Sequence, residues 1–154
     1  MKDRAIIRDA KLEDAERILE IYEYYVRHTA ITFEYAVPAL RDFQERMKNT
    51  LETYPYLVIE ADGVIWGYAY AGPFIGRAAY DWSSETTIYL DPAAQGYGLG
   101  RKIYEALEGR LKQMGILNLY ACIGYPQTED EYLTRNSAEF HVHLGFVQAG
   151  ELHK

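Results

Sequence analysis

Three glycines lie close together in the stretch Gln95-Gly96-Tyr97-Gly98-Leu99-Gly100, where a strand-like run passes into a run with helical spacing. Glycine has no Cβ atom, so it lets a ligand approach the backbone closely. A helix N-terminus also carries unpaired amide groups and the positive end of the helix dipole, which together bind phosphate. The pattern Gln95-x-x-Gly98-x-Gly100 therefore predicts a pyrophosphate site made of backbone amides, to which Arg101 adds a positive charge.

Spacing excludes two other phosphate-binding patterns. A P-loop needs Lys followed by Ser or Thr, and no such pair follows these glycines. A dinucleotide fingerprint needs glycine at the sixth position from Gly96, where Arg101 stands. It also needs an acid about twenty residues later, and Tyr120 is found there instead. A glycine-rich turn that serves only tight packing is the remaining alternative.

Hydrophobic periodicity predicts ten elements in the order β, α, α, β, β, β, α, β, α, β. Asp62-Gly63 is a favoured hairpin pair, Pro38 suits the first turn of the second helix, and Gly115 and Gly145 end helices. The expected strands are 5–8, two between 56 and 72, 84–90, 116–124 and one from Phe146; the expected third and fourth helices are 98–114 and 137–144. The expected inward positions of the first three helices are Leu12, Ala15, Leu19, Tyr22 and Val26, then Leu40, Phe43, Met47 and Leu51, then Leu99, Ile103, Leu107, Leu111 and Met114.

This order indicates one mixed α/β domain over residues 1–154, an antiparallel meander followed by a right-handed βαβ crossover with helices on both faces. Together with the glycine loop it resembles the GNAT superfamily of N-acetyltransferases, whose members grip the pyrophosphate of acetyl-coenzyme A at this loop. The resemblance implies their acyl-coenzyme A acyltransferase fold.

A narrower resemblance is to the phosphinothricin acetyltransferases and their methionine sulfone and sulfoximine relatives. It covers nearly the whole chain. The residues that match the branch's motifs are Tyr54, Pro55, Leu57, Val58, Glu60, Asp62, Gly63, Ala71, Gly72, Pro73, Arg77, Ala79, Tyr80, Asp81, Trp82, Glu85, Tyr89, His141, Leu144, Gly145 and Phe146. Thr134 departs from the pattern, because the branch has an Asn there that reaches the cofactor; Asn136 is nearby.

The resemblance implies roles for two titratable residues. Glu85, on the strand before the glycine loop, is the expected base that removes a proton from the acceptor ammonium, directly or through a water. A surface carboxylate is the alternative. His141 is the expected partner that donates or accepts a proton near neutral pH; a packing or solvent-facing histidine is the alternative.

The cofactor site is expected to use backbone amides of Ile88, Tyr89 and Leu90, which polarise the thioester carbonyl and pair with the pantetheine arm. The remaining cofactor-binding residues that we expect are Gln95, Gly96, Tyr97, Gly98, Leu99, Gly100, Arg101, Thr134 and Asn136.

An amino-acid acceptor carries a carboxylate, which a guanidinium binds with two hydrogen bonds. Arg77 is the first candidate, with an ordinary exposed arginine as its alternative. Phe33, Tyr80 and Trp82 are expected to wall the acceptor pocket, unless they are core or dimer contacts, and Glu34 is a weaker polar candidate.

Composition narrows the function class. The net charge of −7 argues against nucleic-acid binding. The one cysteine, Cys122, excludes an intramolecular disulfide, and no metal is expected because the histidines lack ligand spacing. The N-terminus has no long apolar stretch, so neither a signal peptide nor a membrane anchor is expected, and the cytoplasm is the default location. Fifteen tyrosines indicate amphipathic packing, an aromatic-lined cleft or a subunit interface such as that of a homodimer.

The sequence thus predicts an N-acetyltransferase that moves acetyl from acetyl-coenzyme A to the primary amine of a small amino-acid-like acceptor. Transfer is expected to be direct, in a ternary complex without an acyl-enzyme. Two alternatives stay open: the same chemistry on a protein N-terminus or polyamine, and a non-catalytic acyl-coenzyme A sensor.

Overall fold

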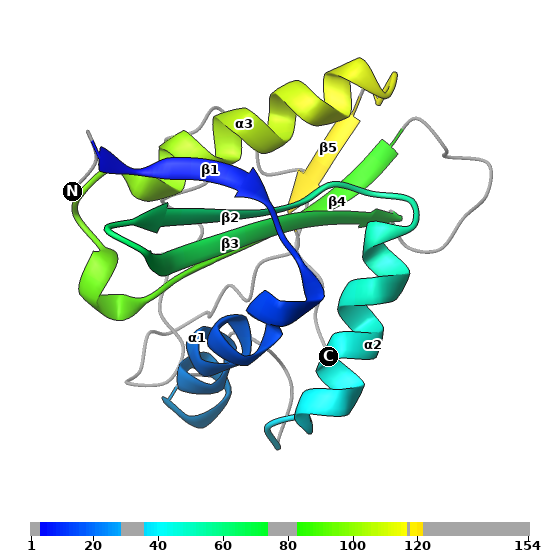
Figure 1. Ribbon diagram of the computed structural model, residues 1–154. Helices are drawn as coiled ribbons and strands as arrows, with labels where there is room; N and C mark the ends of the chain where they lie inside the picture. Colours follow the sequence, from blue (N-terminus) through cyan, green and yellow to red (C-terminus); the bar gives the residue numbers. More distant parts are fainter. Residues whose placement is uncertain (1–3, 29–35, 74–82, 117, 122–154) are drawn as a thin grey trace, which may run out of the picture.

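The structure is a computed structural model that describes residues 4–28, 36–73, 83–116 and 118–121 (Figure 1). Its strands are β1 (Ile6–Asp9), β2 (Tyr56–Ala61), β3 (Val64–Pro73), β4 (Ser83–Leu90) and β5 (Asn118–Ala121). Its helices are α1 (Ala15–His28), α2 (Leu40–Leu51) and α3 (Leu99–Gln113), with 3₁₀ turns η2 (Leu12–Asp14) and η4 (Pro92–Ala94). The helix and strand expected after residue 136 lie outside the described residues.

The described strands form one mixed sheet in the order β1-β2-β3-β4-β5. Neighbours from β1 to β4 are antiparallel, whereas β4 and β5 are parallel and are connected through α3. Asp62 (φ 54°) and Gly63 (φ 80°) turn the β2–β3 hairpin, since positive φ at both positions matches the twist of the two strands. The predicted meander and crossover are confirmed.

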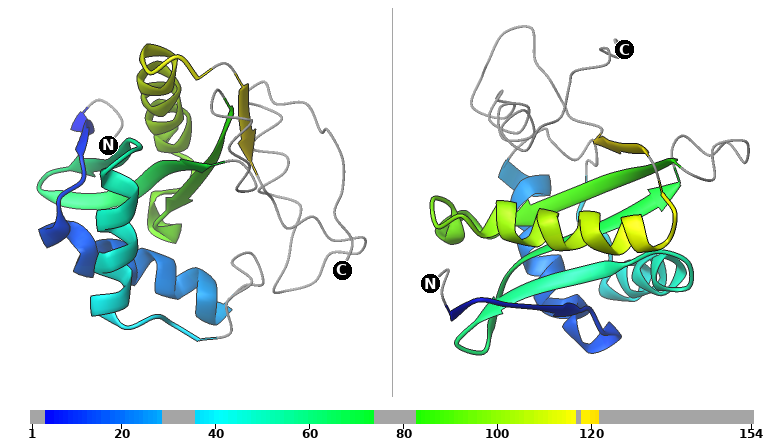
Figure 2. Two further views of the ribbon diagram at one scale, coloured as in Figure 1. Left: turned by 90° about the vertical axis from the view of Figure 1, so that its right-hand side faces the viewer. Right: turned by 90° about the horizontal axis from the view of Figure 1, so that it is seen from above.

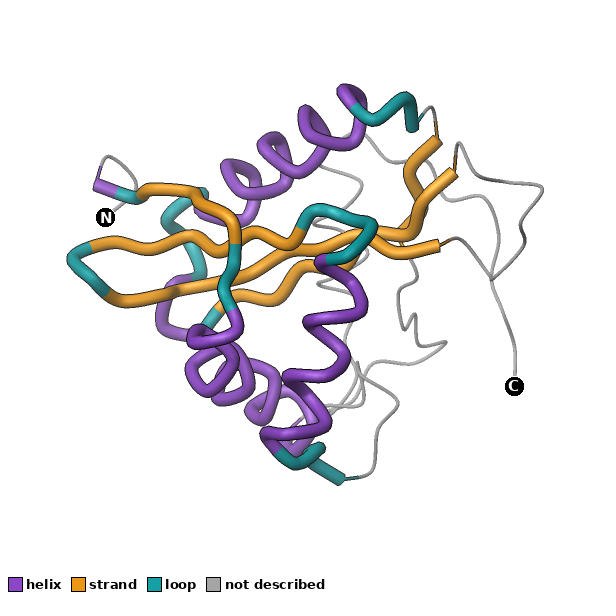
Figure 3. Tube along the Cα trace, turned by 45° about the vertical axis from the view of Figure 1, so that its right-hand side comes forward, coloured by secondary structure: helices purple, strands orange, loops and turns teal. Residues whose placement is uncertain are grey.

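The sheet lies between two helical layers. Figure 1 shows α3 along one face and α1 with α2 against the other, and the left-hand view of Figure 2 shows the same arrangement. In the tube of Figure 3 the orange strands separate α3 from the α1–α2 pair. Helices on both faces are therefore confirmed.

The two faces of the sheet have different cores. The buried cluster on the α3 face is aliphatic, with Tyr54 and Trp66 partly buried against it, and its buried members are Ala5, Leu57, Ile59, Ala61, Ala69, Ala71, Ala94, Leu99, Ile103, Leu107, Leu111 and Ile116. The α1–α2 face is rich in tyrosine, and its buried residues are Ala10, Ala15, Ile18, Ile21, Tyr22, Tyr25, Phe43, Met47, Tyr56, Val58, Ile65 and Tyr68. Tyrosine is thus concentrated on one side of the sheet.

Helix ends are where the predicted inward positions fail. Leu12, Leu40 and Met114 are exposed by 40%, 38% and 47%, because they lie in η2, at the first residue of α2 and after the last residue of α3. Side chains at such ends project past the sheet. Pro38 precedes α2 by two residues and is not in its first turn.

The buried stripe of α1 is also rotated from the predicted one. Ile18, Ile21 and Tyr25 are buried, whereas Leu19 and Val26 are only partly buried at its edge. The apolar spacing of this helix fits both stripes, so periodicity did not determine its rotation.

Candidate active site

Strand β4 carries the predicted base. Neighbouring residues of a strand point to opposite faces, and Tyr89 packs on the α1–α2 face while Ile88 and Leu90 pack on the α3 face. Glu85 and Thr87 therefore share the α1–α2 face with Tyr89. Glu85 is half-buried there, opposite Gly72 of β3. The Glu85 side chain is therefore partly accessible to solvent.

The second half of β4 is paired on one side only within the described residues. β5 pairs with Ser83–Thr86, whereas β3 pairs with β4 as far as Leu90. The β5-facing edge of Thr87–Leu90 is therefore the place where an extended ligand can add backbone hydrogen bonds. The predicted carbonyl-binding residues Ile88, Tyr89 and Leu90 all lie in this segment.

The loop after β4 is built to expose backbone amides. The Asp91 carboxylate accepts a hydrogen bond from the Ala93 amide at 2.9 Å and so starts η4. Gly96 (φ 90°) and Gly98 (φ 76°) have left-handed backbone that favours glycine. Residues 95–98 are all exposed.

Gly98 is the N-cap of the fifteen-residue helix α3 and has no side chain to cap it. The first helical hydrogen bond runs from the Lys102 amide to the Gly98 carbonyl at 3.3 Å, so the Leu99 and Gly100 amides have no acceptor within the helix. They supply the dipole end that the sequence predicted for a pyrophosphate. Arg101 is exposed, and its guanidinium lies 3.6 Å from Glu105 one turn on, a weak ion pair.

Helix α1 holds this loop in place through Tyr25. The Tyr25 hydroxyl donates a hydrogen bond to the Leu90 carbonyl and is also hydrogen-bonded to the Gln95 side chain. Burial raises the pKa of Tyr25 to about 12, so the hydroxyl keeps its proton at neutral pH. Tyr25 therefore links the end of β4 to the first residue of the glycine pattern.

A second link joins α1 to the start of the loop. Arg17 lies 2.8 Å from the Asp91 carboxylate, donates to the Ile65 carbonyl at 3.0 Å and stacks over Trp66. Sequence reasoning missed Arg17, Tyr25 and Asp91. Asp91 could have been found from the sequence, because Asp-Pro is typical of the start of a helix. The periodicity of α1 gave no indication that Arg17 or Tyr25 contacts the loop.

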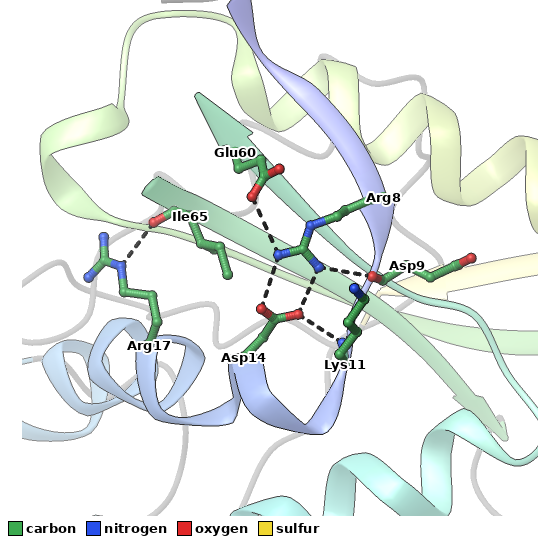
Figure 4. Close-up of polar contacts among 7 residues, drawn as sticks. All are labelled: Arg8, Asp9, Lys11, Asp14, Arg17, Glu60 and Ile65. Carbon is green, nitrogen blue, oxygen red and sulfur yellow. Dashed lines mark hydrogen bonds and ion pairs between the residues drawn. The ribbon is translucent and has the colours of Figure 1, made fainter. Parts of the chain in front are cut away.

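The N-terminal end of α1 is fixed in turn by the cluster in Figure 4. Arg8 of β1 is hydrogen-bonded to Asp14 at 2.8 and 3.0 Å and to Glu60 at 3.4 Å, and the Lys11 amide donates to Asp14 at 2.8 Å. Hydrogen bonding to Arg8 lowers the pKa of the Asp14 carboxyl, against the effect of burial. Arg17 and the Ile65 carbonyl appear in the same view.

The structure thus brings together Glu85, Ile88–Leu90 and the 95–101 loop on consecutive elements. The other predicted site residues lie outside the described residues and stay predictions; they are Phe33, Glu34, Arg77, Tyr80, Trp82, Thr134, Asn136 and His141. Among the described residues no group of three His, Cys, Asp or Glu side chains is placed to hold a metal ion. None of the described helices is long and apolar enough to cross a membrane.

Sequence relatives agree with this arrangement. A phosphinothricin N-acetyltransferase of Alcaligenes faecalis is 35% identical over 148 residues, which are 96% of this chain and 71% of that protein. An L-methionine sulfoximine/L-methionine sulfone acetyltransferase of Salmonella typhimurium is 31% identical over 152 residues, 95% of this chain and 82% of that protein.

A solved structure agrees as well. The phosphinothricin acetyltransferase of Sinorhizobium meliloti, a GNAT superfamily protein in complex with acetyl-coenzyme A, superposes with a TM-score of 0.85 at 34% identity and covers 96% of this chain and 77% of its own. Residues 7–154 match the acetyltransferase (GNAT) domain family. The chain therefore belongs to the GNAT family of N-acetyltransferases.

Proposed function

We propose that this enzyme transfers the acetyl group of acetyl-coenzyme A to the primary amine of a small amino-acid-like acceptor, within one domain over residues 1–154 and in the cytoplasm. One observation carries the proposal: half-buried Glu85 lies on the strand that leads into an uncapped helix N-terminus. The named activities of the relatives support the acceptor class, with phosphinothricin, methionine sulfone and methionine sulfoximine as examples.

The described residues fit coenzyme A. The Leu99 and Gly100 amides and the left-handed glycines Gly96 and Gly98 form a cradle for a diphosphate. The edge of Thr87–Leu90 that faces away from β3 has no strand partner within the described residues, and it fits the extended pantetheine arm. Gln95, Tyr97 and Arg101 border the same loop, and we assign Thr134 and Asn136 to the cofactor's other side.

The residues of the chain have separate tasks in this reaction. Glu85 accepts a proton from the acceptor ammonium, whose pKa lies well above 7, and so makes the amine a nucleophile. A backbone amide among Ile88–Leu90 stabilises negative charge on the carbonyl oxygen. When bound, acetyl-coenzyme A supplies the thioester: the C–N bond forms, the C–S bond breaks and the leaving thiolate takes up a proton. His141 donates or relays that proton.

The acceptor's α-carboxylate is assigned to Arg77, because a guanidinium binds it bidentately. Phe33, Tyr80 and Trp82 wall the pocket, and Glu34 is a further polar contact. A homodimer stays part of this proposal, and equilibrium sedimentation of the full chain tests it.

The test combines turnover with binding. Release of coenzyme A is measured with amino-acid, peptide and polyamine acceptors, and cofactor affinity is measured by calorimetry for wild type and Glu85→Gln. We expect turnover with amino-acid analogues, a fall in kcat of about 10²–10⁴-fold in the variant, and unchanged affinity. If both proteins bind the cofactor alike and neither acetylates any amine, the chain is a sensor. Preferred turnover of peptides or polyamines would replace the acceptor class.

A further inference from the structure

The pairing of β4 with β3 determines which backbone groups of β4 face a ligand. The Asp91 amide donates to the Trp66 carbonyl at 2.9 Å, so this is a hydrogen-bonded position of the antiparallel ladder. Gly67 and Leu90, one position back, are then a non-hydrogen-bonded pair, and alternation gives Ile88 the same orientation as Leu90. The N–H and C=O groups of Ile88 and Leu90 therefore point away from β3, to the edge that has no strand partner within the described residues.

Tyr25 of α1 occupies one of these backbone groups. Its hydroxyl donates a hydrogen bond to the Leu90 carbonyl. Since a phenol has a single proton, the hydrogen bond between Tyr25 and the Gln95 side chain is donated by the Gln95 amide. The Leu90 carbonyl and the Gln95 side chain, five residues apart in sequence, are therefore both bonded to one oxygen atom.

The Leu90 carbonyl is the last group of β4 on this edge before the glycine loop. A carbonyl oxygen carries partial negative charge, whereas the Leu99 and Gly100 amides at the N-terminus of α3 carry partial positive charge. An open carbonyl at the start of the loop would repel the diphosphate that these amides attract. The Tyr25 hydroxyl takes up this acceptor, and the Leu90 amide is left as the backbone donor at this end of the edge.

Helix α1 is fixed well enough to keep the Tyr25 hydroxyl in this place. The Tyr25 ring is 8% exposed and packs against Tyr89 with 5.0 Å between ring centroids. Arg17 lies two turns before Tyr25 on the same side of the helix and is 2.8 Å from the Asp91 carboxylate. The peptide between Leu90 and Asp91 is thus held by two side chains of one helix.

We propose that Tyr25 is a positioning residue for coenzyme A. Its hydroxyl covers the Leu90 carbonyl and orients Gln95, so that backbone donors and not this acceptor face the diphosphate. The inference rests on the proposed cofactor site. Tyr25 acts through Leu90 and Gln95, and not on the thioester or on the acceptor amine.

Binding of coenzyme A tests this role separately from acetyl transfer, because it needs no acceptor. The Kd of coenzyme A is measured by calorimetry for wild type, Tyr25→Phe, Gln95→Ala and the double variant. The kcat and the KM values of acetyl-coenzyme A and of the acceptor are measured for the same proteins, with L-methionine sulfone as acceptor. Gln95 is exposed, so its variant tests the same link without a change in the core.

Two control variants accompany these proteins. Tyr24→Phe removes a hydroxyl from the neighbouring position of α1, where the ring is 40% exposed and packs against Tyr25 with 5.2 Å between centroids. Leu107→Ala destabilises the fold from the buried side of α3 and leaves Tyr25 in place. All affinities are measured well below the unfolding temperature of each protein.

We expect Tyr25→Phe to raise the Kd of coenzyme A and the KM of acetyl-coenzyme A about tenfold, because the Leu90 carbonyl loses its partner. The kcat and the acceptor KM stay close to wild type, since the lost interaction acts on cofactor binding. The double variant loses less affinity than the product of the two single losses, because both side chains act through one hydroxyl. Both control variants keep the wild-type affinity.

The outcomes distinguish failure of this role from failure of the proposed function. An unchanged Kd in Tyr25→Phe, or single losses that multiply fully in the double variant, overturns the positioning role. An equal loss of affinity in Leu107→Ala overturns it too, because affinity would then follow stability. If affinity depends on Tyr25 as expected and no amine is acetylated, the proposed acetyl transfer is overturned and the role of Tyr25 stands.

Discussion

The two faces of the sheet bury similar numbers of side chains but with different chemistry. On the α3 face Leu, Ile and Ala side chains can only pack. On the α1–α2 face rings of tyrosine stack, with Tyr56 and Tyr70 centroids 4.7 Å apart and Tyr68 and Tyr70 6.3 Å apart. Tyrosine fills space as well as an aliphatic residue does, and it also brings a hydroxyl.

Strand β4 takes part in both faces and shows what the difference means. Its Ile88 and Leu90 side chains belong to the aliphatic core, whereas Glu85, Thr87 and Tyr89 lie on the tyrosine face. Because successive residues of a strand point to opposite faces, the side chains of β4 are divided between the aliphatic core and the face that carries Glu85. The aliphatic face fixes where β4 and the glycine loop lie, and the tyrosine face carries Glu85, the proposed base.

The largest expected effect on stability is on the aliphatic face. Leu107 is fully buried on α3, and Leu107→Ala removes its packing and leaves a cavity, so the free energy of unfolding falls by about 2–5 kcal/mol. Denaturant titration measures this fall in the free energy of unfolding. Activity per folded molecule stays the same, because Leu107 does not face the site. Leu12→Ala, at a 40% exposed position, is the control and changes stability little; an equal loss there contradicts the assignment of the core.

The next effect tests how closely β3 and β4 approach on the aliphatic face. A Cβ atom at Gly67 would lie 2.5 Å from Leu90 Cδ2 and 3.1 Å from the Tyr89 carbonyl oxygen. Gly67→Ala therefore shifts the end of β4 and destabilises the fold by about 1–3 kcal/mol. The same shift of β4 raises the KM for acetyl-coenzyme A. Gly109→Ala on α3 meets no atom within 4 Å and stabilises the helix by up to about 1 kcal/mol.

Alkaline pH should act on the tyrosine face through Tyr25. The pKa of Tyr25 is about 12 in the folded chain and about 10 when unfolded, so the folded state binds its proton more tightly. The stability that follows is complete below pH 10 and is lost as the pH rises towards 12, by about 1–3 kcal/mol.

Unfolding free energies measured from pH 8 to 12 check this expectation. Tyr25→Phe is less stable at pH 8, because the hydrogen bond to the Leu90 carbonyl is lost, and its stability falls less steeply above pH 10. Leu107→Ala changes no titratable group and keeps the wild-type slope. Parallel curves for Tyr25→Phe and wild type would show that this phenol does not cause the alkaline loss.

The sequence was sufficient for those parts of the fold that depend on local pattern. Asp62-Gly63 fixed the hairpin, Leu99, Ile103, Leu107 and Leu111 fixed the buried side of α3, and the glycine spacing located the exposed amides of the loop. Each of these signals acts over a few residues, where backbone preference and periodicity decide the outcome.

Contacts between distant residues could not be predicted in this way. Tyr25 reaches Leu90 across 65 positions and Arg17 reaches Asp91 across 74, and each partner becomes visible only when α1 is packed against the end of β4. The same holds for the sorting of tyrosines onto one face. The spacing of α1 fits two rotations, and only the shape of the sheet selects the one that buries Tyr25.

The smallest effect concerns the polar edge of the tyrosine face. Asp14→Asn keeps the shape that accepts the Lys11 amide but removes the charge paired with Arg8, and we expect a loss of about 1 kcal/mol at pH 7. Because the folded pKa of Asp14 is lowered, this contribution is present above the unfolded value of about 4 and disappears as the pH falls through the folded pKa. Denaturant titrations at pH 7 and in acid measure the difference between variant and wild type.

Asp9→Asn is the matched control. Asp9 is paired with Arg110, and because these side chains are 64% and 46% exposed, their ion pair contributes less. Equal losses in both variants would show that Asp14 acts as another surface charge and does not anchor α1 beside the site.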